Sequence, residues 1–482
     1  MIDMTLAHAA NCLRLNRIQT EKAFATSAQL ALNTGGLDVA MPIFDFPAEI
    51  KDTTSFHGIS INSREISPGN LFVALKGDKF DGHDFVEHAR QNGATAALVS
   101  RKVKSALPQL IVDDCVSALG KLAENWRNQF QIPIIAVTGS NGKTTLKNML
   151  AAILMNACQM NPEFVLFTPG TLNNHLGLPL TLANLNKQHR YAVVEMGMNH
   201  FGEIAYLTKI TRPHVAIITN AAAAHLSGVG SLSGVAQAKS EIFLGLETDG
   251  TAILNRDDAF YTFWRAQIGN RPYLTFGFHP DADVSLQQAS SDPTHPIPFR
   301  TPVGPLTVRL NLLGQHNILN ALAATAAMLA IGIEREAIQT GLASVKPAPG
   351  RLQLYTLPNE IRIIDDTYNA NPFSLKAAVA TLSSFLGKKI FVMGDMKELG
   401  DDEIALHHEA GSELRDHGID HLFTFGHLSA HTAQTFGENA IHFEDKTKLI
   451  KALKPLLQPQ TTVLVKGSRS MKMEQVVAEL LI

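Results

Sequence analysis

The sequence contains the segment Val137-Thr-Gly-Ser-Asn-Gly-Lys-Thr-Thr145 between two apolar runs. The preceding run, Ile132-Pro-Ile-Ile-Ala-Val137, has the length and composition of a buried strand, and the following run, from Leu146 to Ala157, is long enough for a helix. Gly139 and Gly142 allow the backbone to turn so that several N–H groups point inward, and the N-terminus of the helix adds positive potential. This order of strand, glycine loop and helix predicts a site for phosphate groups.

The side chains of this loop suit phosphate and a hard metal ion. Lys143 offers a mobile cation to terminal phosphates, and the hydroxyl of Thr144 is an oxygen ligand of the kind that Mg²⁺ prefers. The full Walker pattern has a glycine at the position of Val137, so only its second half, G-x-x-G-K-T, is present and a purely structural turn is the alternative. The residues expected to line the phosphates are Gly139, Ser140, Asn141, Gly142, Lys143, Thr144 and Thr145.

Length and composition indicate a globular protein of several domains. The 482 residues exceed one ordinary core and suggest about three domains. With 45% hydrophobic residues, 18% charged residues and a formal net charge of -3, nucleic acid is not an expected partner. No apolar run reaches the ~18 residues that a membrane span needs.

The cysteines and the first residues favour the cytoplasm. Cys12, Cys115 and Cys158 are far apart and odd in number, which fits neither a disulfide framework nor a zinc site. The chain begins without the basic, apolar and small-residue order of a secretory signal. We therefore expect a cytoplasmic protein in a reducing environment.

Strand and helix patterns extend on both sides of the phosphate loop. Before it, strands are expected at Asn70-Leu-Phe-Val-Ala-Leu75 and Ala96-Ala-Leu-Val99, with a helix near Asp84 to Asn92 between them, whereas residues 18–55 show no firm pattern. The segments expected after it are the continuous apolar strands Tyr191-Ala-Val-Val194 and His214-Val-Ala-Ile-Ile-Thr219, the alternating strand Leu306-Thr-Val-Arg-Leu-Asn-Leu312 and an alanine-rich helix from Asn317 to Ile331.

Pro347-Ala-Pro-Gly350 interrupts this pattern and predicts a hinge. Beyond it, strands are expected at Arg362-Ile-Ile-Asp365, Lys389-Ile-Phe-Val-Met393 and Thr462-Val-Leu-Val465, with helices between them. We therefore predict an α/β fold of three domains. These are a small N-terminal α/β domain (1–130), a central P-loop-type mononucleotide-binding α/β domain (131–346) and a C-terminal Rossmann-like α/β domain (347–482).

Several motifs together resemble those of the Mur ligases, ATP-dependent amide-forming enzymes of peptidoglycan synthesis. They are Thr138-Gly-Ser-Asn-Gly-Lys-Thr-Thr145, Glu195-Met-Gly-Met198, Gly314-Gln-His-Asn317, Pro349-Gly-Arg351 and Asp366-Thr-Tyr-Asn-Ala-Asn-Pro372. Asn62-Ser-Arg-Glu65 with Pro68-Gly-Asn-Leu-Phe-Val-Ala-Leu75, and Met393-Gly-Asp-Met-Lys-Glu-Leu399, are similar to the branch that handles D-alanyl-D-alanine. The resemblance covers about residues 56 to 482.

The resemblance implies how a carboxylate is made to react with an amine. Members transfer the γ-phosphoryl group of ATP to the carboxylate, and the amine then attacks the acyl phosphate, so the protein mainly positions groups and neutralises charge. The implied partners are UDP-N-acetylmuramoyl-tripeptide and D-alanyl-D-alanine, with ATP and Mg²⁺ as cofactors. The first domain would bind the UDP-sugar, the last would bind the dipeptide, and the protein would act as a monomer in cell-wall biogenesis.

Family positions assign catalytic roles to Lys143, Glu195, His225 and Lys239. Glu195 would hold a second Mg²⁺ beside the ion on Thr144, with a solvated glutamate at a strand end as the alternative. His225 would lie near the metal, or be an ordinary loop residue. Lys239 falls where several members carry a carbamylated lysine that helps to hold the metal; a free ammonium or a surface lysine are the alternatives.

The nucleotide and the acid substrate would be held by further family positions. Asn317 would lie against adenine and ribose, unless it caps a helix, while Arg351 and Asp366 would reach the nucleotide when the last domain closes. The positions expected to hold the acid substrate are Ser63 and Arg64, on the diphosphate of the UDP-sugar, and Asn173 and Asn174, which could instead build a turn.

The acceptor dipeptide would meet Tyr368, Asn369 and Asn371, although loop asparagines also cap helices. Lys466 would bind or align its terminal carboxylate, with Arg469 as a rival. Another Mur ligase or a folylpolyglutamate synthetase is the alternative activity, and an ATP-dependent switch is an alternative from a different class. The third residue of the tripeptide is encoded in no motif.

Overall fold

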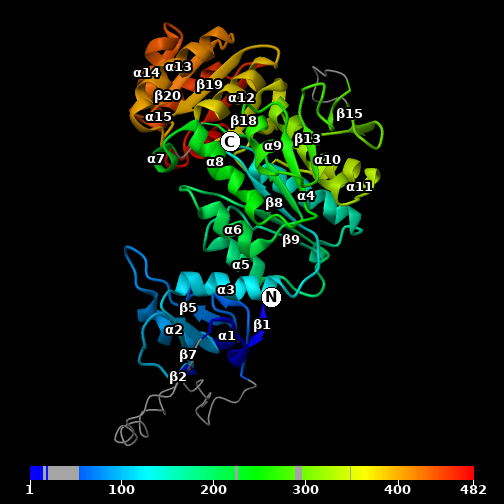
Figure 1. The fold of residues 1–482 in the computed structure, drawn as a ribbon. Helices are drawn as coiled ribbons and strands as arrows, with labels where there is room; N and C mark the ends of the chain where they lie inside the picture. The colour runs from blue at the N-terminus through cyan, green and yellow to red at the C-terminus, as the bar shows by residue number, and fades with distance from the viewer. Residues whose placement is uncertain (15–17, 20–53, 223–225, 288–295, 348, 482) are drawn as a thin grey trace, which may run out of the picture. The chain divides into compact units, whose positions relative to one another are not determined.

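The computed structural model describes residues 1–14, 18–19, 54–222, 226–287, 296–347 and 349–481. Its helices and parallel strands form the α/β fold that the sequence predicts (Figure 1). The chain divides into two compact units. The first consists of Met1–Pro133, Leu166–Val194 and Lys209–Arg212, and the second of Ile134–Val165, Glu195–Thr208 and Pro213–Ile482. The domain boundaries placed at residues 130 and 346 stay predictions.

The first unit contains a five-stranded sheet with the strand order β2-β7-β6-β5-β4. Its strands are β2 (Ile18–Gln19), β4 (Ile59–Ser60), β5 (Leu71–Val73), β6 (Ala96–Val99) and β7 (Gln109–Ile111). Phe72 and Ala97, on neighbouring strands, share a core with Val86 and Ala89 of α2 (Val86–Gln91). The two strands and the helix predicted in this part are confirmed.

A strand pair and three helices also belong to the first unit. They are β1 (Asp3–Thr5), paired antiparallel with β3 (Ser55–His57), and α1 (Leu6–Cys12), α3 (Cys115–Arg127) and α5 (Gly177–Ala183). Helix α3 packs against α1 and α5, and the indole Nε1 of Trp126 donates to the carbonyl oxygen of Leu185 at 3.0 Å. Residues 20–53, for which the sequence gives no firm pattern, lie outside the described residues.

In the second unit, four parallel strands have the order β13-β12-β11-β8. They are β8 (Ile134–Thr138), β11 (Val215–Ile218), β12 (Thr251–Asn255) and β13 (Tyr273–Phe276). Every residue of β8 and β11 is buried, as expected for a parallel sheet that is covered on both faces. Because the carboxyl ends of parallel strands meet at one edge, the loops after β8 and β11 come together there.

Three helices pack on one another beside this sheet (Figure 1). They are α4 (Lys143–Ala157), α10 (Gln315–Ala330) and α11 (Arg335–Ser344). The strand predicted at 306–312 is confirmed as β16 (Leu306–Val308), which pairs antiparallel with β15 (Ile297–Arg300). The other elements between residues 165 and 286 are β9 (Val165–Phe167), β10 (Tyr191–Glu195), α6 (Glu203–Thr211), α7 (Leu226–Val229), α8 (Leu232–Ser240), α9 (Tyr261–Gln267) and β14 (Ser285–Leu286).

The last part of the second unit is a six-stranded sheet with the order β17-β18-β22-β19-β20-β21. Its strands are β17 (Gln353–Thr356), β18 (Arg362–Asp366), β19 (Lys389–Gly394), β20 (His421–Phe425), β21 (Ala440–Phe443) and β22 (Thr462–Lys466). Only the edge strand β17 is antiparallel to its neighbour. The three strands predicted beyond the proline segment are confirmed, and this segment includes Ala348, which lies outside the described residues.

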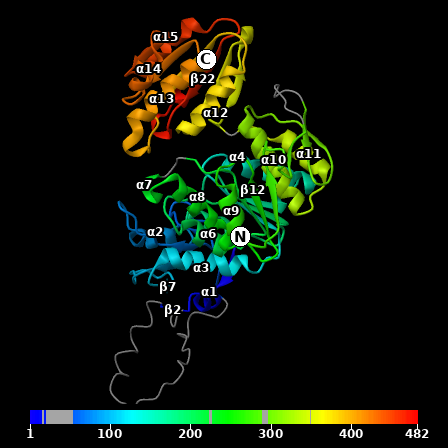
Figure 2. The same ribbon diagram turned by 45° about the horizontal axis from the view of Figure 1, so that its top comes forward.

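Alternate side chains of these strands pack on opposite faces of the sheet. Ile364 and Phe391 share a core with α12, α13 and α14, whereas Ile363 and Ile390 share one with α15 and α16. The helices are α12 (Pro372–Ser383), α13 (Glu403–Asp416), α14 (Ser429–Phe436), α15 (Lys446–Leu453) and α16 (Glu474–Leu480). Figure 2 shows β22 between the labelled helices of this part. Such a sheet collects functional groups at the carboxyl ends of its strands.

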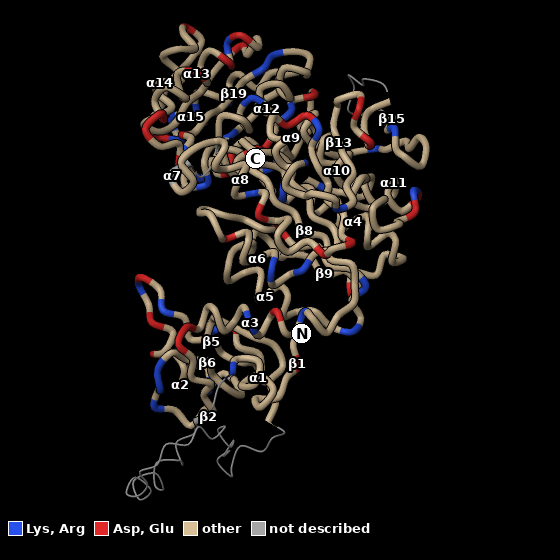
Figure 3. The backbone as a smooth tube through the Cα atoms, in the orientation of Figure 1, with Lys and Arg blue, Asp and Glu red and all other residues tan. Residues whose placement is uncertain are grey.

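Basic and acidic residues are both distributed over the described chain (Figure 3), and the formal net charge of the full sequence is -3. Among the helices that the structure describes, we find none with the length and apolar content to span a bilayer.

Candidate active site

The phosphate loop follows β8 and is in close contact with the loop after β11 and with α10. Gly139 and Gly142 have φ values of 149° and 84°. A Cβ atom on Gly139 would lie 1.7 Å from Oγ1 of Thr219, and one on Gly142 would lie 2.6 Å from Oδ1 of Asn320. Glycine is therefore required at both positions, for conformation and for space. Helix α4 begins directly after the loop, at Lys143, which is earlier than its apolar run indicates.

Polar groups after β11 hold this loop in shape. The hydroxyl of Thr219 donates to the carbonyl oxygen of Asn141 at 2.6 Å, and Oδ1 of Asn220 accepts the backbone N–H of Asn141 at 3.0 Å. The backbone N–H of Ala222 donates to Oγ of Ser140 at 2.9 Å. Sequence reasoning missed Thr219 and Asn220. Their signal is that they are polar and stand directly after a buried strand, at the edge where the loops of a parallel sheet converge.

Two of the predicted catalytic lysines are in an electropositive, poorly hydrated region. Nζ of Lys143 donates to the carbonyl oxygens of Gly139 at 2.7 Å and of Ser140 at 3.4 Å, so its ammonium folds back over the loop. Burial lowers the pKa of Lys143. Lys239, on α8, is 2% exposed, and burial together with the charge of Lys143 lowers its pKa well below the usual range. A surface lysine at position 239 is therefore excluded.

Glu195, at the end of β10, is 1% exposed, so the alternative of a solvated glutamate is wrong. Its Oε1 accepts a hydrogen bond from the hydroxyl of Thr144 at 3.3 Å. Its Oε2 lies 3.6 Å from Nζ of Lys147, which is 2% exposed and which sequence reasoning missed. Lys147 follows Lys143 by one helical turn, and this spacing was its only signal.

The oxygens of Thr144 and Glu195 suit a hard divalent cation. A carboxylate and a hydroxyl within hydrogen-bond distance of each other, next to a phosphate loop, match the donors that Mg²⁺ prefers. In the described part of the chain, no three His, Cys, Asp or Glu residues gather in a way that could hold a metal. Mg²⁺ usually takes one or two protein oxygens and completes its shell with phosphate and water.

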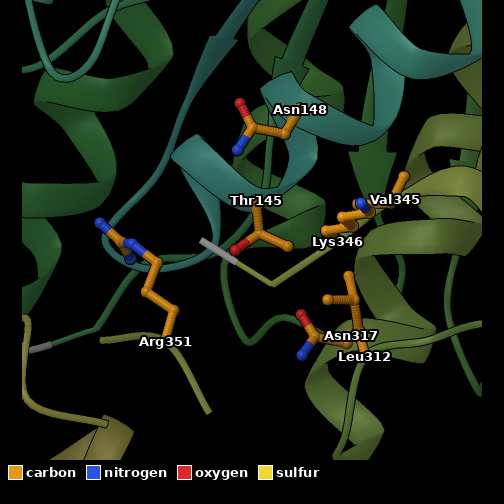
Figure 4. A pocket seen from close by; sticks show the side chains of 7 residues that line it. All are labelled: Thr145, Asn148, Leu312, Asn317, Val345, Lys346 and Arg351. Carbon is orange, nitrogen blue, oxygen red and sulfur yellow. The ribbon is translucent and has the colours of Figure 1, made fainter. Parts of the chain in front are cut away.

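A pocket beside the loop brings together residues from four segments. It is lined by Thr145, Asn148, Leu312, Asn317, Val345, Lys346 and Arg351. Figure 4 shows Thr145 between Arg351 on one side and Val345, Lys346 and Asn317 on the other. The N-cap of α10 is Gly314, and Nδ2 of Asn317 donates to the carbonyl oxygen of Leu313 at 2.7 Å. Asn317 therefore lies inside the helix, and its interpretation as a cap is wrong.

Arg351 links this pocket to the predicted acceptor loop. Its Nη2 lies 3.5 Å from the hydroxyl of Thr144, at the limit of a hydrogen bond. Its guanidinium stacks on the ring of Tyr368, 4.1 Å from the centroid. The two predicted residues, one assigned to nucleotide and one to dipeptide, thus lie together near the phosphate loop.

Asp366 and Lys466 end neighbouring strands, β18 and β22, and form a buried ion pair with Nζ and Oδ2 2.5 Å apart. Nζ of Lys466 also donates to the carbonyl oxygen of Asn369 at 3.0 Å. Burial raises the pKa of Asp366 although Lys466 opposes this shift. Arg469, the rival of Lys466, is 65% exposed and pairs with Glu474 at 2.9 Å.

The asparagines of the acceptor loop have mainly local partners. Asn371 caps α12, with its Oδ1 accepting the backbone N–H of Ser374 at 2.8 Å, as the alternative interpretation predicted. Its Nδ2 also donates to Oδ1 of Asn141, in the phosphate loop, at 3.2 Å. Oδ1 of Asn369 accepts the backbone N–H of Ala370 at 2.9 Å.

Four predicted substrate residues belong to the first unit. Oγ of Ser63 lies 3.1 Å from Nδ1 of His88, and Arg64 is exposed on the same turn. Oδ1 of Asn174 accepts the backbone N–H of Gly177 at 2.8 Å ahead of α5, so Asn174 does build a turn, as the alternative states. Asn173 precedes it in the same loop. His225 lies outside the described residues.

We compared the sequence and the structure with those of known proteins. The sequence matches the Mur ligase family, catalytic domain, over residues 55–127, the Mur ligase middle domain over residues 137–328 and the Mur ligase, glutamate ligase domain over residues 350–469. It is 45% identical over 428 residues to the UDP-N-acetylmuramoyl-tripeptide–D-alanyl-D-alanine ligase of Escherichia coli, covering 88% of this chain and 93% of that protein. The chain belongs to the Mur ligase family. The resemblance inferred from the motifs is confirmed.

Other Mur ligases agree over most of their length. The ligase of the same name from Bacillus subtilis is 37% identical over 451 residues, covering 89% of this chain and 94% of that protein. A crystal structure of MurF from Acinetobacter baumannii has a TM-score of 0.83 at 39% identity, covering 89% and 94% of the two chains. MurF from Thermotoga maritima, solved in complex with ADP, has a TM-score of 0.79 at 31% identity, covering 88% and 97%. The predicted three-domain α/β fold class is confirmed.

Proposed function

We propose that this Mur ligase joins D-alanyl-D-alanine to UDP-N-acetylmuramoyl-tripeptide and consumes ATP through an acyl phosphate. The relatives named above support the substrates. The observation that carries the proposed chemistry is the phosphate loop, with the ammonium of Lys143 over it and the carboxylate of Glu195 within hydrogen-bond distance of Thr144. A folylpolyglutamate synthase of Mycobacterium tuberculosis, 18% identical with a TM-score of 0.60, shares the fold alone.

The role of the chain in the first step is to hold the phosphates and to neutralise their charge. The backbone N–H groups of the loop and Lys143 would bind the β- and γ-phosphates of ATP. The carboxylate of the tripeptide attacks the γ-phosphorus, the bond to the bridging oxygen breaks, and ADP leaves. In the second step the amine of the dipeptide attacks the carbonyl carbon, and phosphate leaves with the electron pair of the broken C–O bond. Lys143 and Arg351 would stabilise the charge that develops on oxygen in both steps.

Mg²⁺ would be held by Thr144 and Glu195, and it would neutralise phosphate charge when bound. Lys239 is a candidate for carbamylation, which would add a second carboxylate to this site. The reaction with CO₂ requires a neutral amine, and the lowered pKa of this buried lysine favours that form. His225 is retained as a proposal near the metal. These four residues, with Lys143, are the proposed catalytic and metal-binding set.

The remaining contacts are proposed on the family positions and on their packing. Asn317 and Asp366 would bind adenine and ribose, and Arg351, which lines the pocket that contains Thr145, would reach the phosphates of the nucleotide. The dipeptide would be bound by Tyr368, Asn369, Asn371 and Lys466. The ammonium of Lys466 also forms the ion pair with Asp366. The residues proposed for the UDP-sugar are Ser63, Arg64, Asn173 and Asn174. We also propose a cytoplasmic monomer.

Product formation tests the activity directly. The purified chain is incubated with Mg-ATP, UDP-N-acetylmuramoyl-tripeptide and D-alanyl-D-alanine, and the UDP-linked pentapeptide is identified by mass. Phosphate release should require both organic substrates. Release without either of them would indicate a switch, and turnover with another amino acid or with a folate in place of these substrates would indicate a sibling ligase. Lysine and diaminopimelate forms of the tripeptide, compared by kcat/KM, identify its third residue.

A further inference from the structure

The side-chain amide of Asn141, in the middle of the phosphate loop, forms a hydrogen bond with the described part of the chain through its oxygen but not through its nitrogen. Oδ1 accepts a hydrogen bond from Nδ2 of Asn371 at 3.2 Å. Nδ2 is buried and, among the described residues, has no hydrogen-bond partner. A buried N–H donor without an acceptor is costly, so such a donor in a phosphate loop indicates that an acceptor belongs there.

A backbone group fixes the orientation of both amides. Oδ1 of Asn371 accepts the N–H of Ser374 at 2.8 Å, which only an oxygen can do, so the other branch of Asn371 must be the NH₂ group. That group can donate only to the oxygen of Asn141. The NH₂ group of Asn141 is therefore turned away from Asn371. The orientation follows from one helix cap through two successive hydrogen bonds.

We propose that Asn371 is a positioning residue that orients the amide of Asn141, so that Nδ2 of Asn141 donates to a phosphate oxygen of the bound nucleotide. This inference rests on the proposed function. It gives Asn371 a role in nucleotide binding, whereas the family resemblance assigns it to the dipeptide. The N-terminus of α12 would then contribute to nucleotide binding through the phosphate loop, although Asn371 and Asn141 are 230 residues apart in sequence.

Loss of Asn371 would free the amide of Asn141 to rotate. The NH₂ group would then no longer be held toward the phosphate, and an orientation that brings Oδ1 there is unfavourable because the partial negative charge of this oxygen repels a phosphate oxygen. A hydrogen bond to a charged group accounts for about a tenfold change in affinity or more. The same donor is lost when Asn141 itself is truncated, so the two changes should act on one interaction.

The experiment replaces Asn371 by serine and measures nucleotide binding to the full chain. Serine retains the N-cap of α12 but is too short to reach Asn141, so the thermal unfolding midpoint should stay close to wild type. We expect the Kd for Mg-ADP and for a non-hydrolysable Mg-ATP analogue, measured by calorimetry, to rise about tenfold. Asn161→Ser is the matched control, because Asn161 also caps a helical turn by accepting the N–H of Glu163, and its Kd should be unchanged.

A double-mutant cycle tests whether Asn371 acts through Asn141 or whether each residue contacts the nucleotide independently. Asn141→Ala should raise the nucleotide Kd about as much as Asn371→Ser, and the double variant should be no weaker than the weaker single variant. If the rise in Kd of the double variant equals the product of the two single rises, the proposal is overturned. An unchanged nucleotide Kd in Asn371→Ser, with a raised KM for D-alanyl-D-alanine, would also overturn it while the wild-type chain still forms product. Failure of the wild-type chain to form product would instead reject the proposed function.

Discussion

Three lysines on α4 and α8 illustrate how burial tunes single side chains. Burial lowers the pKa of Lys143, Lys147 and Lys239, because an ammonium loses hydration there. The neighbours of the three ammonium groups differ. Lys143 contacts loop carbonyls, Lys147 lies beside the carboxylate of Glu195, and Lys239 is influenced by the positive charge of Lys143. Residue type and spacing alone do not separate these environments.

Lys143→Ala should lower kcat by about 10³-fold, because the ammonium acts on charge that grows in the transition state. The fold should persist, since the ammonium of this lysine contacts carbonyl oxygens of its own loop. Steady-state kinetics and circular dichroism check both statements. Near-normal turnover in a folded variant would reject the role of this residue.

Lys147→Met should lower the free energy of unfolding by about 3 kcal/mol, because it leaves the buried carboxylate of Glu195 without the nearby ammonium. Urea unfolding without nucleotide measures this change. The double variant Lys147→Met/Glu195→Gln, which removes both charges, should recover most of the loss. Equal stability of the wild type and the single variant would contradict a stabilising ion pair.

At the level of secondary structure, the loop after β19 depends on α13 for its shape. His407, on α13, is fully buried; its Nδ1–H donates to the carbonyl oxygen of Glu403 at 2.6 Å, and its Nε2 accepts the backbone N–H of Met396 at 3.1 Å. Both ring nitrogens are satisfied only in the neutral imidazole. Burial lowers the pKa of His407, His431 acts in the same direction, and the charges of Asp395 and Glu403 oppose them.

This histidine predicts a loss of stability in mild acid. Its folded-state pKa is lowered below the ordinary value of about 6.5, so its contribution is complete above that pH and is lost as the pH falls toward the folded-state pKa. The slope is at most about 1.4 kcal/mol per pH unit. Urea unfolding at pH 7.5 and 5.5 should show a smaller difference for His407→Gln than for the wild type. Identical pH dependence in the two proteins would rule this assignment out.

The strands and helices that the sequence predicted have local signals. The strand before the phosphate loop, the alanine-rich helix α10 and the strands β18, β19 and β22 of the last sheet are apolar runs in the sequence, whereas β17, β20 and β21 of that sheet were not predicted. The predicted helix starts were wrong where a backbone conformation sets the first residue of the helix. Gly142 and Gly314, both with positive φ, start α4 and α10, and this moved Asn317 from an expected cap to the interior of a helix.

For the molecule as a whole, the candidate residues divide between its two compact units. Ser63 and Arg64 belong to the first unit, whereas the phosphate loop and the C-terminal sheet belong to the second. Binding of the UDP-sugar and binding of ATP should therefore respond to different mutations.

Arg64→Ala should raise the KM for the UDP-sugar about tenfold and leave the KM for ATP unchanged, because an arginine fork that binds a diphosphate is lost. Lys121→Ala, which removes another exposed basic side chain of the same unit, is the control and should change neither constant. A raised KM for ATP, or an unchanged KM for the sugar nucleotide, would count against the assignment.

The strand, the glycine loop and the helix follow one another in consecutive residues, so the sequence alone predicts the phosphate loop. The α/β class and the family also follow from local patterns and motifs. Contacts between distant segments could not. The pair Asp366–Lys466 joins residues 100 apart, and the bond between Asn371 and Asn141 joins residues 230 apart. Glu195 and Lys147, which are also distant in sequence, are both buried and lie 3.6 Å apart only in the folded chain. Charge, burial and hydrogen-bond direction depend on neighbours in space, and the folded chain alone supplies those neighbours.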